Sequence, residues 1–304
     1  MQLTTQVNIS HSKHEINYND RVFMIGSCFS ENMSLKFQEA YFRINSNPFG
    51  VLYNPLSIAR CIDILLDNTP EPQLPVVRHN GLWHSMLHHG EFSRADRQEF
   101  DAAVKQSIAD GRRALKEASV VIVTFGTAWV YEIEGDIVGN CHKLPQDMFT
   151  RRRLSAKEIT DRWLKLLGRT ELCNKHFIFT VSPIRHLKDG LHENQLSKAT
   201  LLLATEQLAK TCGTPSAGYF PSYEIMTDEL RDYRFYADDM LHPSAVAVEY
   251  IWQRFMDTYF SNATKQEMLP LMQLYSAEKI INGDFKGLRD RGGGFPARVA
   301  DALL

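Results

Sequence analysis

Three residues able to act as nucleophiles, or to position one, stand together early in the chain. Ser27, Cys28 and Ser30 follow the apolar run Val22–Ile25 and Gly26. Such a run predicts a buried strand, a sharp turn and then a helix. At this kind of turn, side chains lie at the carboxyl end of a sheet beside unpaired helix N–H groups, where α/β proteins place nucleophiles or bind anions. The stretch therefore predicts a reactive site if a base lies nearby.

A base with its own orienting group occurs late in the chain. Asp239 and His242 form the pattern D-x-x-H ahead of an expected helix. A carboxylate at this spacing can hold the imidazole in one tautomer while the other ring nitrogen faces a nucleophile. The alternatives are ordinary structural roles: Cys28 as a small buried residue, and Ser27 and Ser30 as a turn residue and a helix cap.

The elements that must position these residues alternate between strand and helix five times. We expect a parallel sheet with helices on both faces, an α/β fold whose ligands bind at the carboxyl ends of the strands. The clearest interior strand is Ser119–Phe125, and another is Phe177–Val181. Four of the five strand ends carry small or polar residues, which should converge on one rim: Gly26–Cys28, Asn47–Gly50, Gly126–Thr127 and Ser182–Pro183.

Capping patterns give the expected helix starts. Asn54–Pro55 and Ser155 with Glu158 each predict one helix, and Ser93 with Asp96 predicts another ending near Lys116. Pro243 is expected at the first position of a helix that follows His242. The first helix of the chain should begin at about Glu31. Further helices are expected at 193–210 and 264–282.

Two insertions are expected in the sandwich. Residues 68–92 form a long excursion of the kind that often serves as a lid or a substrate-binding insertion. Residues 131–150 contain an expected hairpin around Gly135–Asp136, and the basic run Arg151–Arg153 is expected on a solvated face. We divide the chain into a main domain at 1–262 and a helical extension with a flexible tail at 263–304.

Composition excludes several classes of function. Lys and Arg total 34 against 36 for Asp and Glu, so no overall field favours nucleic acid or an anionic membrane. No stretch has the length and apolarity of a membrane span, and we expect a cytoplasmic protein. Five cysteines without a C-x-x-C pair argue against a disulfide framework or zinc ribbon. His84, His88 and His89 lack a third ligand at metal-site spacing, so no metal is expected.

Several blocks of the chain, in order, resemble one known family. The resemblance is to the GSCFA family within the SGNH, or GDSL-like, hydrolase superfamily, and it covers roughly Val22 to Phe255. It is carried by Gly26–Phe29, Gly126–Ala128, Asn140–Lys143, Ser182–His186, the run FPSYEIMTDELRDYRFY at 220–236 and the run DMLHPS at 239–244.

This resemblance implies a three-layer α/β/α sandwich with a flavodoxin-like parallel sheet of about five strands. It implies His242 as base and Asp239 as its orienting group, and its register places the nucleophile on Cys28, with Ser27 as the alternative. A thiol beside a helix N-terminus and a histidine can have a lowered pKa. The superfamily's oxyanion asparagine falls on Ala128 here, so the expected donors are backbone N–H groups near Cys28 and Gly50.

Other residues near this rim are expected to contact the oxyanion or the substrate. Against these roles stand ordinary packing for His89 and structural hydrogen bonds for His142 and His186. Arg231, Asp232 and Arg234 either brace the loop before His242 or clamp an anionic substrate. The expected contacts are Gly126, Thr127, Asn140, His142, Arg185, His186 and His89.

The expected function is hydrolysis of an ester bond, with removal of an acyl group from a carbohydrate-linked substrate through a Cys(or Ser)–His–Asp relay. One alternative is an O-acyltransferase with a donor such as acyl-CoA. Another is a non-catalytic carbohydrate-binding or regulatory module on the same fold. The presence of Ala128 in place of the superfamily's oxyanion asparagine favours this alternative. No cofactor is expected. The partner is a small-molecule or carbohydrate ester, without nucleic acid, and the sequence leaves the oligomeric state open.

Overall fold

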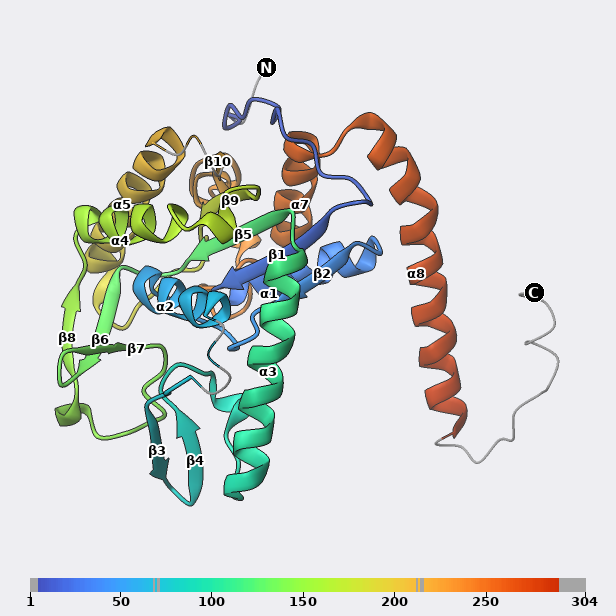
Figure 1. The fold of residues 1–304 in the computed structure, drawn as a ribbon. Helices are drawn as coiled ribbons and strands as arrows, with labels where there is room; N and C mark the ends of the chain where they lie inside the picture. Colours follow the sequence, from blue (N-terminus) through green and yellow to red (C-terminus); the bar gives the residue numbers. More distant parts are fainter. Residues whose placement is uncertain (1–4, 68, 70–71, 212, 214–215, 290–304) are drawn as a thin grey trace.

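The computed structural model describes residues 5–67, 69, 72–211, 213 and 216–289, with side chains up to residue 275. Its core is a five-stranded parallel sheet with the strand order β10-β9-β5-β1-β2 (Figure 1). If the five strands are numbered by their order in the chain and the sheet is followed from β2 to β10, the order is second, first, third, fourth and fifth. This is the flavodoxin-like arrangement. The strands are β1 (Arg21–Gly26), β2 (Arg43–Ser46), β5 (Val120–Phe125), β9 (His176–Val181) and β10 (Ser216–Phe220).

Both faces of the sheet are covered by helices, which is why its interior strands β1, β5 and β9 are mostly apolar and almost entirely buried. Successive side chains of a strand point to opposite faces. Phe23 and Ile25 of β1 join one buried cluster, with residues of α2 (Pro55–Leu66), α3 (Arg97–Glu117), α4 (Ala156–Leu167) and α5 (Gly190–Thr211). Val22 and Met24 join the other, with α1 (Cys28–Glu39), α7 (Ala245–Tyr259) and the start of α8 (Asn262–Arg289). The predicted α/β/α sandwich is therefore confirmed.

Two small antiparallel sheets project from the sandwich. One is the hairpin of β3 (Val76–His79) and β4 (Leu82–Ser85), inside the predicted excursion. The other joins β6 (Trp129–Ile133), β7 (Asp136–Val138) and β8 (Thr150–Arg153) in the order β7-β6-β8. The predicted hairpin around Gly135 is confirmed.

The predicted solvated face for Arg151–Arg153 is confirmed in part, since their side chains are 25%, 40% and 32% exposed. These residues form β8, and carboxylates from three other elements neutralise their guanidinium groups. Their ion pairs join Arg151 with Asp189, Arg152 with Glu132 and Glu158, and Arg153 with Glu193.

Helix starts differ from the sequence predictions at three places. Helix α1 begins at Cys28 rather than near Glu31. Asp96, not Ser93, caps α3 by accepting hydrogen bonds from two backbone N–H groups. Ser244 caps α7, so Pro243 precedes the cap instead of opening the helix. The capping box of Ser155 with Glu158 is confirmed.

Near the C-terminus, Ser222–Glu224 forms the short α6, followed by a π-helical turn at Ile225–Leu230. Helix α8 includes the predicted helix at 264–282 and extends away from the sandwich (Figure 1). The tail predicted to begin at Gly292 lies outside the described residues, and so does Cys212. In the described part of the chain, no helix is long and apolar enough to cross a membrane.

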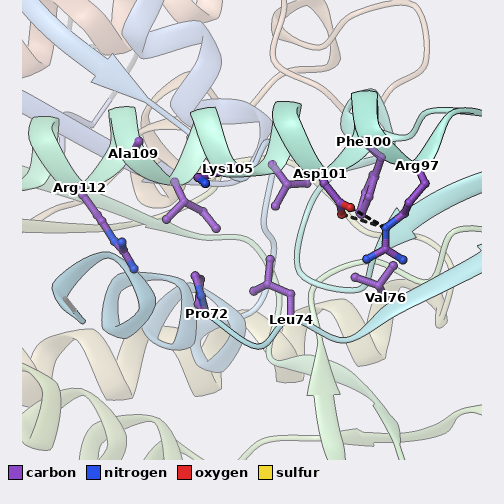
Figure 2. Close-up of a pocket in the computed structure, with 11 residues that line it drawn as sticks. Pro72, Leu74, Val76, Arg97, Phe100, Asp101, Lys105, Ala109 and Arg112 are labelled. Atoms are coloured by element: carbon purple, nitrogen blue, oxygen red, sulfur yellow. Dashed lines mark hydrogen bonds and ion pairs between the residues drawn. The ribbon is translucent and has the colours of Figure 1, made fainter. Parts of the chain in front are cut away.

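The segment before β3 lies along α3 and leaves a shallow hollow of about 400 Å³ between them. Figure 2 shows Leu74, Val76 and Phe100 in this hollow, with the ion pair of Arg97 and Asp101 at one end. Cys28 and His242 do not line it. The hollow is therefore separate from the rim where the strand ends meet.

Candidate functional site

The turn after β1 can be made only by glycine. Gly26 has a φ of +148°, and a Cβ at this position would lie 2.2 Å from the carbonyl oxygen of Thr124. The N–H of Gly26 donates to Oδ1 of Asn47, 2.8 Å away, which ties the end of β1 to the loop after β2. This close packing lets the chain enter helix α1 at Cys28, directly above the sheet edge.

The three possible nucleophiles of this turn have different surroundings. Ser27 is 1% exposed, and its hydroxyl caps α1 by accepting from the N–H of Phe29. Ser30 is buried and donates to the hydroxyl of Thr124. Cys28 is partly exposed, and of the three residues it is the one that lines a cleft. Access to a substrate therefore favours Cys28.

The cleft has a volume of about 580 Å³, and two of the four predicted strand ends line it, one through Cys28 and the other through Thr127. Both Cys28 and His242 line it, so the structure brings the early turn and the late D-x-x-H pattern to one space. The other predicted site residues that line it are Thr127, Asn140, Arg185 and His186.

The contact between Asp239 and His242 is confirmed. Oδ2 of Asp239 lies 2.5 Å from Nδ1 of His242, and Oδ1 accepts from the backbone N–H groups of Leu241 and His242. These backbone donors, together with the imidazole, lower the pKa of Asp239 to about 2. The carboxylate is thus ionised at neutral pH and fixes the tautomer with Nε2 free, since no described residue bonds to Nε2.

The turn that presents His242 is braced from the end of β9. The N–H of Arg185 donates to the carbonyl of Leu241, and its guanidinium donates to the carbonyl of Met240. Arg185 therefore positions the base as well as lining the cleft. Arg234 pairs with Asp232 on the exposed surface, outside the cleft lining.

Cys28 has a hydrogen-bonding neighbour that the sequence analysis missed. Its Sγ lies 3.5 Å from the hydroxyl of Tyr53. Burial raises the pKa of Cys28 and the carboxylate of Glu31 raises it further, while Tyr53 and the backbone N–H of Cys28 act in the opposite direction. The expectation of a lowered pKa was therefore wrong, because desolvation exceeds the effect of the helix N-terminus.

Within the described residues, no hydrogen bond joins Cys28 to His242. Instead, the rings of Tyr53 and His186 meet edge to face, with their centroids 6.1 Å apart. Burial lowers the pKa of His186 to about 3, and the nearby Lys198 adds to this effect. His186 is therefore neutral at physiological pH, and Cys28, Tyr53, His186 and His242 all line the cleft.

Most of the predicted oxyanion donors are already used. The N–H of Gly50 donates to Asn47, and those of Gly126 and Thr127 donate to the carbonyl of Tyr53. The N–H of Cys28 belongs to the first turn of α1, where a helix provides no acceptor. Asn140 accepts from the N–H of His142 through Oδ1, and no described residue accepts from its Nδ2. Cys28 N–H and Asn140 Nδ2 are the donors left to face a substrate.

Two predicted substrate contacts lie away from the cleft. His142 is buried, and its Nε2 bonds to the carbonyl of Ser85 while its ring packs against that of His84. His89 lies beside Glu91, whose carboxylate is 3.7 Å from its Nδ1. Across the residues that the structure describes, no group of three His, Cys, Asp or Glu side chains is arranged to hold a metal ion.

A buried lysine lies beneath the rim. Lys198 of α5 is 0% exposed, and its Nζ donates to the carbonyls of Gly126 and Ser182 at 2.7 Å each. It therefore joins the ends of β5 and β9. The sequence did contain a signal, because Lys198 interrupts the apolar stripe formed by Leu201 and Leu208 on the inner face of α5.

Lys198 should make stability depend on pH. Burial lowers its pKa from 10.5 to about 7, so between these values the unfolded chain binds a proton that the folded chain lacks. Folding stability contributed by this residue must then rise with pH from about 7 to 10.5 and stay constant below about 7. Relative to Lys198→Met, we expect the wild-type free energy of unfolding to increase by about 1–3 kcal/mol between pH 7 and pH 9. Urea titrations at several pH values measure it, and a flat difference over this range would contradict it.

Comparison with protein families assigns most of the chain to a family. Residues 21–255, more than half of the chain, match the model of the GSCFA family. No curated protein matches the chain. The matched segment contains both halves of the site, from Cys28 to His242.

Proposed function

This chain belongs to the GSCFA family, and we propose that it is a hydrolase of the SGNH type that cleaves ester bonds through Cys28, His242 and Asp239. The observation that carries the proposal is the shared cleft: Cys28 and the base paired with Asp239 open onto the same space. A nucleophile, a base and a group that orients the base are the elements of acyl transfer. The flavodoxin-like strand order and the D-x-x-H pattern support placement in the SGNH superfamily.

In the proposed reaction, Nε2 of His242 takes the proton of the Cys28 thiol. The sulfur attacks the acyl carbonyl, and the N–H of Cys28 with Nδ2 of Asn140 stabilises the oxyanion. The C–O bond breaks, the leaving alkoxide takes the proton from His242, and a thioester remains. Water then loses a proton to His242 and attacks the thioester, which releases the acid and restores the thiol.

The raised pKa of Cys28 makes this base necessary, because few thiols would be ionised at neutral pH without it. In the structure the thiol is hydrogen-bonded to Tyr53 instead of His242. Catalytic hydrogen bonds are often long or misaligned until substrate binds. We propose that substrate entry moves the thiol from Tyr53 toward Nε2 of His242.

A sugar moiety fits the composition of the cleft. Trp129, Tyr131 and Phe149 line it together with Asn140 and several cationic side chains. Aromatic faces beside hydrogen-bonding groups suit a sugar ring, which has apolar C–H faces and polar edges. This composition supports a carbohydrate-linked acyl group as the substrate class.

Partitioning of the acyl group tests the proposed activity. The purified protein is incubated with p-nitrophenyl acetate or glucose pentaacetate, with and without free sugar as acceptor, and Cys28→Ala is the control. We expect free acetate as the main product in both conditions, with none above background in the control. Transfer of most acetyl groups to the sugar would identify an acyltransferase, and the absence of turnover in both would contradict the hydrolase.

A further inference from the structure

Three cationic side chains of the cleft have no carboxylate partner. Lys143, Arg185 and Lys188 all line it, and none forms an ion pair with a carboxylate anywhere in the described chain. Their neighbour Arg151, by contrast, is paired with Asp189, which is the one acidic residue of the lining. With that pair neutral, the lining carries three positive charges in a chain whose net charge is −2.

We propose that the substrate of this cleft is an ester whose non-reacting part carries an anionic group, a phosphate or a carboxylate, bound by Lys143, Arg185 and Lys188. The inference rests on the proposed function for the ester and on the lining charges for the anion. Unpaired cations of one sign around a concave space attract counter-charge more strongly than the same cations on an open surface. Neutral acyl sugars would leave these charges without a partner.

The anchoring of two of these cations favours a defined anion position. Lys188 donates to the hydroxyl of Tyr131, and its Nζ lies 4.8 Å from the centre of that ring. One guanidinium nitrogen of Arg185 donates to the carbonyl of Met240, and the group lies 5.5 Å from the ring centre of Tyr236. Both side chains are thereby held while retaining N–H groups for a ligand, since guanidinium has five donors and ammonium three.

The charge of Lys188 acts on another thiol of the cleft. Cys141 also lines the cleft, and although burial raises its pKa, the charges of Lys188 and Arg151 act to lower it. Arg185 holds the turn that presents His242. An anion bound by Arg185 would therefore contact the side chain that holds the turn of the base, within the same cleft as Cys28.

Thiol alkylation tests the anion site without any ester chemistry. Iodoacetate is anionic and iodoacetamide is neutral, and their rates at each cysteine are measured by peptide mass spectrometry. At low salt, we expect the iodoacetate-to-iodoacetamide rate ratio at Cys28 and Cys141 to exceed the ratio at the exposed Cys173 by about 5-fold or more. At high salt, the ratios at Cys28 and Cys141 should fall toward the ratio at Cys173. Equal ratios at the three thiols would overturn the proposal.

Charge removal assigns the effect to this wall. In the triple variant Lys143→Gln, Arg185→Gln, Lys188→Gln, and to a lesser extent in the double variant that keeps Arg185, the ratio should fall to that of Cys173. A matched control removes three lysines that do not line the cleft and should leave the ratio unchanged. These are Lys157→Gln, Lys165→Gln and Lys210→Gln. A ratio that persists in the triple variant would contradict the assignment.

Protection by ligands identifies the anion. Glucose 6-phosphate, glucuronate and glucose are compared as inhibitors of Cys28 alkylation by iodoacetamide, and the stronger of the two anions names the group. Protection by neither anion beyond that of glucose would overturn the proposal. If the wild type prefers iodoacetate at Cys28 but does not turn over esters, the proposed hydrolase activity fails and the anion site stands. If it turns over esters without that preference, the anion site fails and the hydrolase activity stands.

Discussion

Replacing Cys28 with alanine is expected to lower kcat/KM for ester hydrolysis by ~10³-fold or more, because no other cleft side chain would be in place to form the acyl-enzyme. Cys28→Ser should retain a measurable fraction of the activity, since His242 and Asp239 can still deprotonate a hydroxyl at that position. Release of p-nitrophenol from its acetate, followed at saturating and sub-saturating substrate, measures both variants.

A second thiol in the same cleft provides the matched control. Cys141→Ala removes a partly buried thiol that also lines the cleft but is not at the start of α1, and it should leave most of the activity. Full activity in Cys28→Ala would contradict the assignment. It would direct attention to Ser27, which would then have to leave its cap on α1 to reach a substrate.

Replacing His242 with alanine should lower kcat by ~10²–10⁴-fold at neutral pH, the usual contribution of a general base. The remaining activity should increase with pH, because hydroxide can ionise the thiol once the solution approaches its pKa. That pKa is raised by burial, so the increase should extend above the ordinary range of cysteine. The pH profile of kcat/KM measures this, and the wild type should instead be active near neutrality.

Two further variants separate the base from general effects on the fold. Asp239→Asn keeps the imidazole but loses the charge that orients it, and should lower kcat with little change in thermal unfolding, because Asp239 is exposed. His192→Ala removes an exposed histidine outside the cleft and should leave kcat unchanged. Wild-type activity in His242→Ala at pH 7 would exclude His242 as the base.

The sandwich and much of the rim could be predicted because their signals are local. β5 is buried at every position and apolar at all but Thr124, as expected of a strand covered on both faces, and the contact of Asp239 with His242 spans only three residues. The convergence of Gly26, Asn47 and Gly126 on one edge followed from parallel strands alone. The first two inferences need only a few neighbouring residues, and the third needs only the rule that parallel strands end at the same edge of a sheet.

The features that were missed depend on contacts between distant segments. Tyr53 approaches Cys28 from the loop before α2, and Lys198 reaches two strand ends from α5. The basic run at Arg151 forms a strand by pairing with β6, and carboxylates elsewhere in the chain pair with its guanidinium groups. Burial also decided the direction of the Cys28 pKa, and a sequence pattern gives no measure of how deep a thiol lies.

The most direct test is covalent labelling of Cys28 by an activated acyl ester. The protein is mixed with p-nitrophenyl acetate, quenched in acid within the first turnover, digested and analysed by mass spectrometry, alongside His242→Ala. We predict close to one acetyl group per chain, located on the peptide containing Cys28, and almost none on that peptide in the variant or on Cys173. An acetyl group on another residue, or equal labelling of Cys28 without His242, would contradict the relay of Cys28, His242 and Asp239.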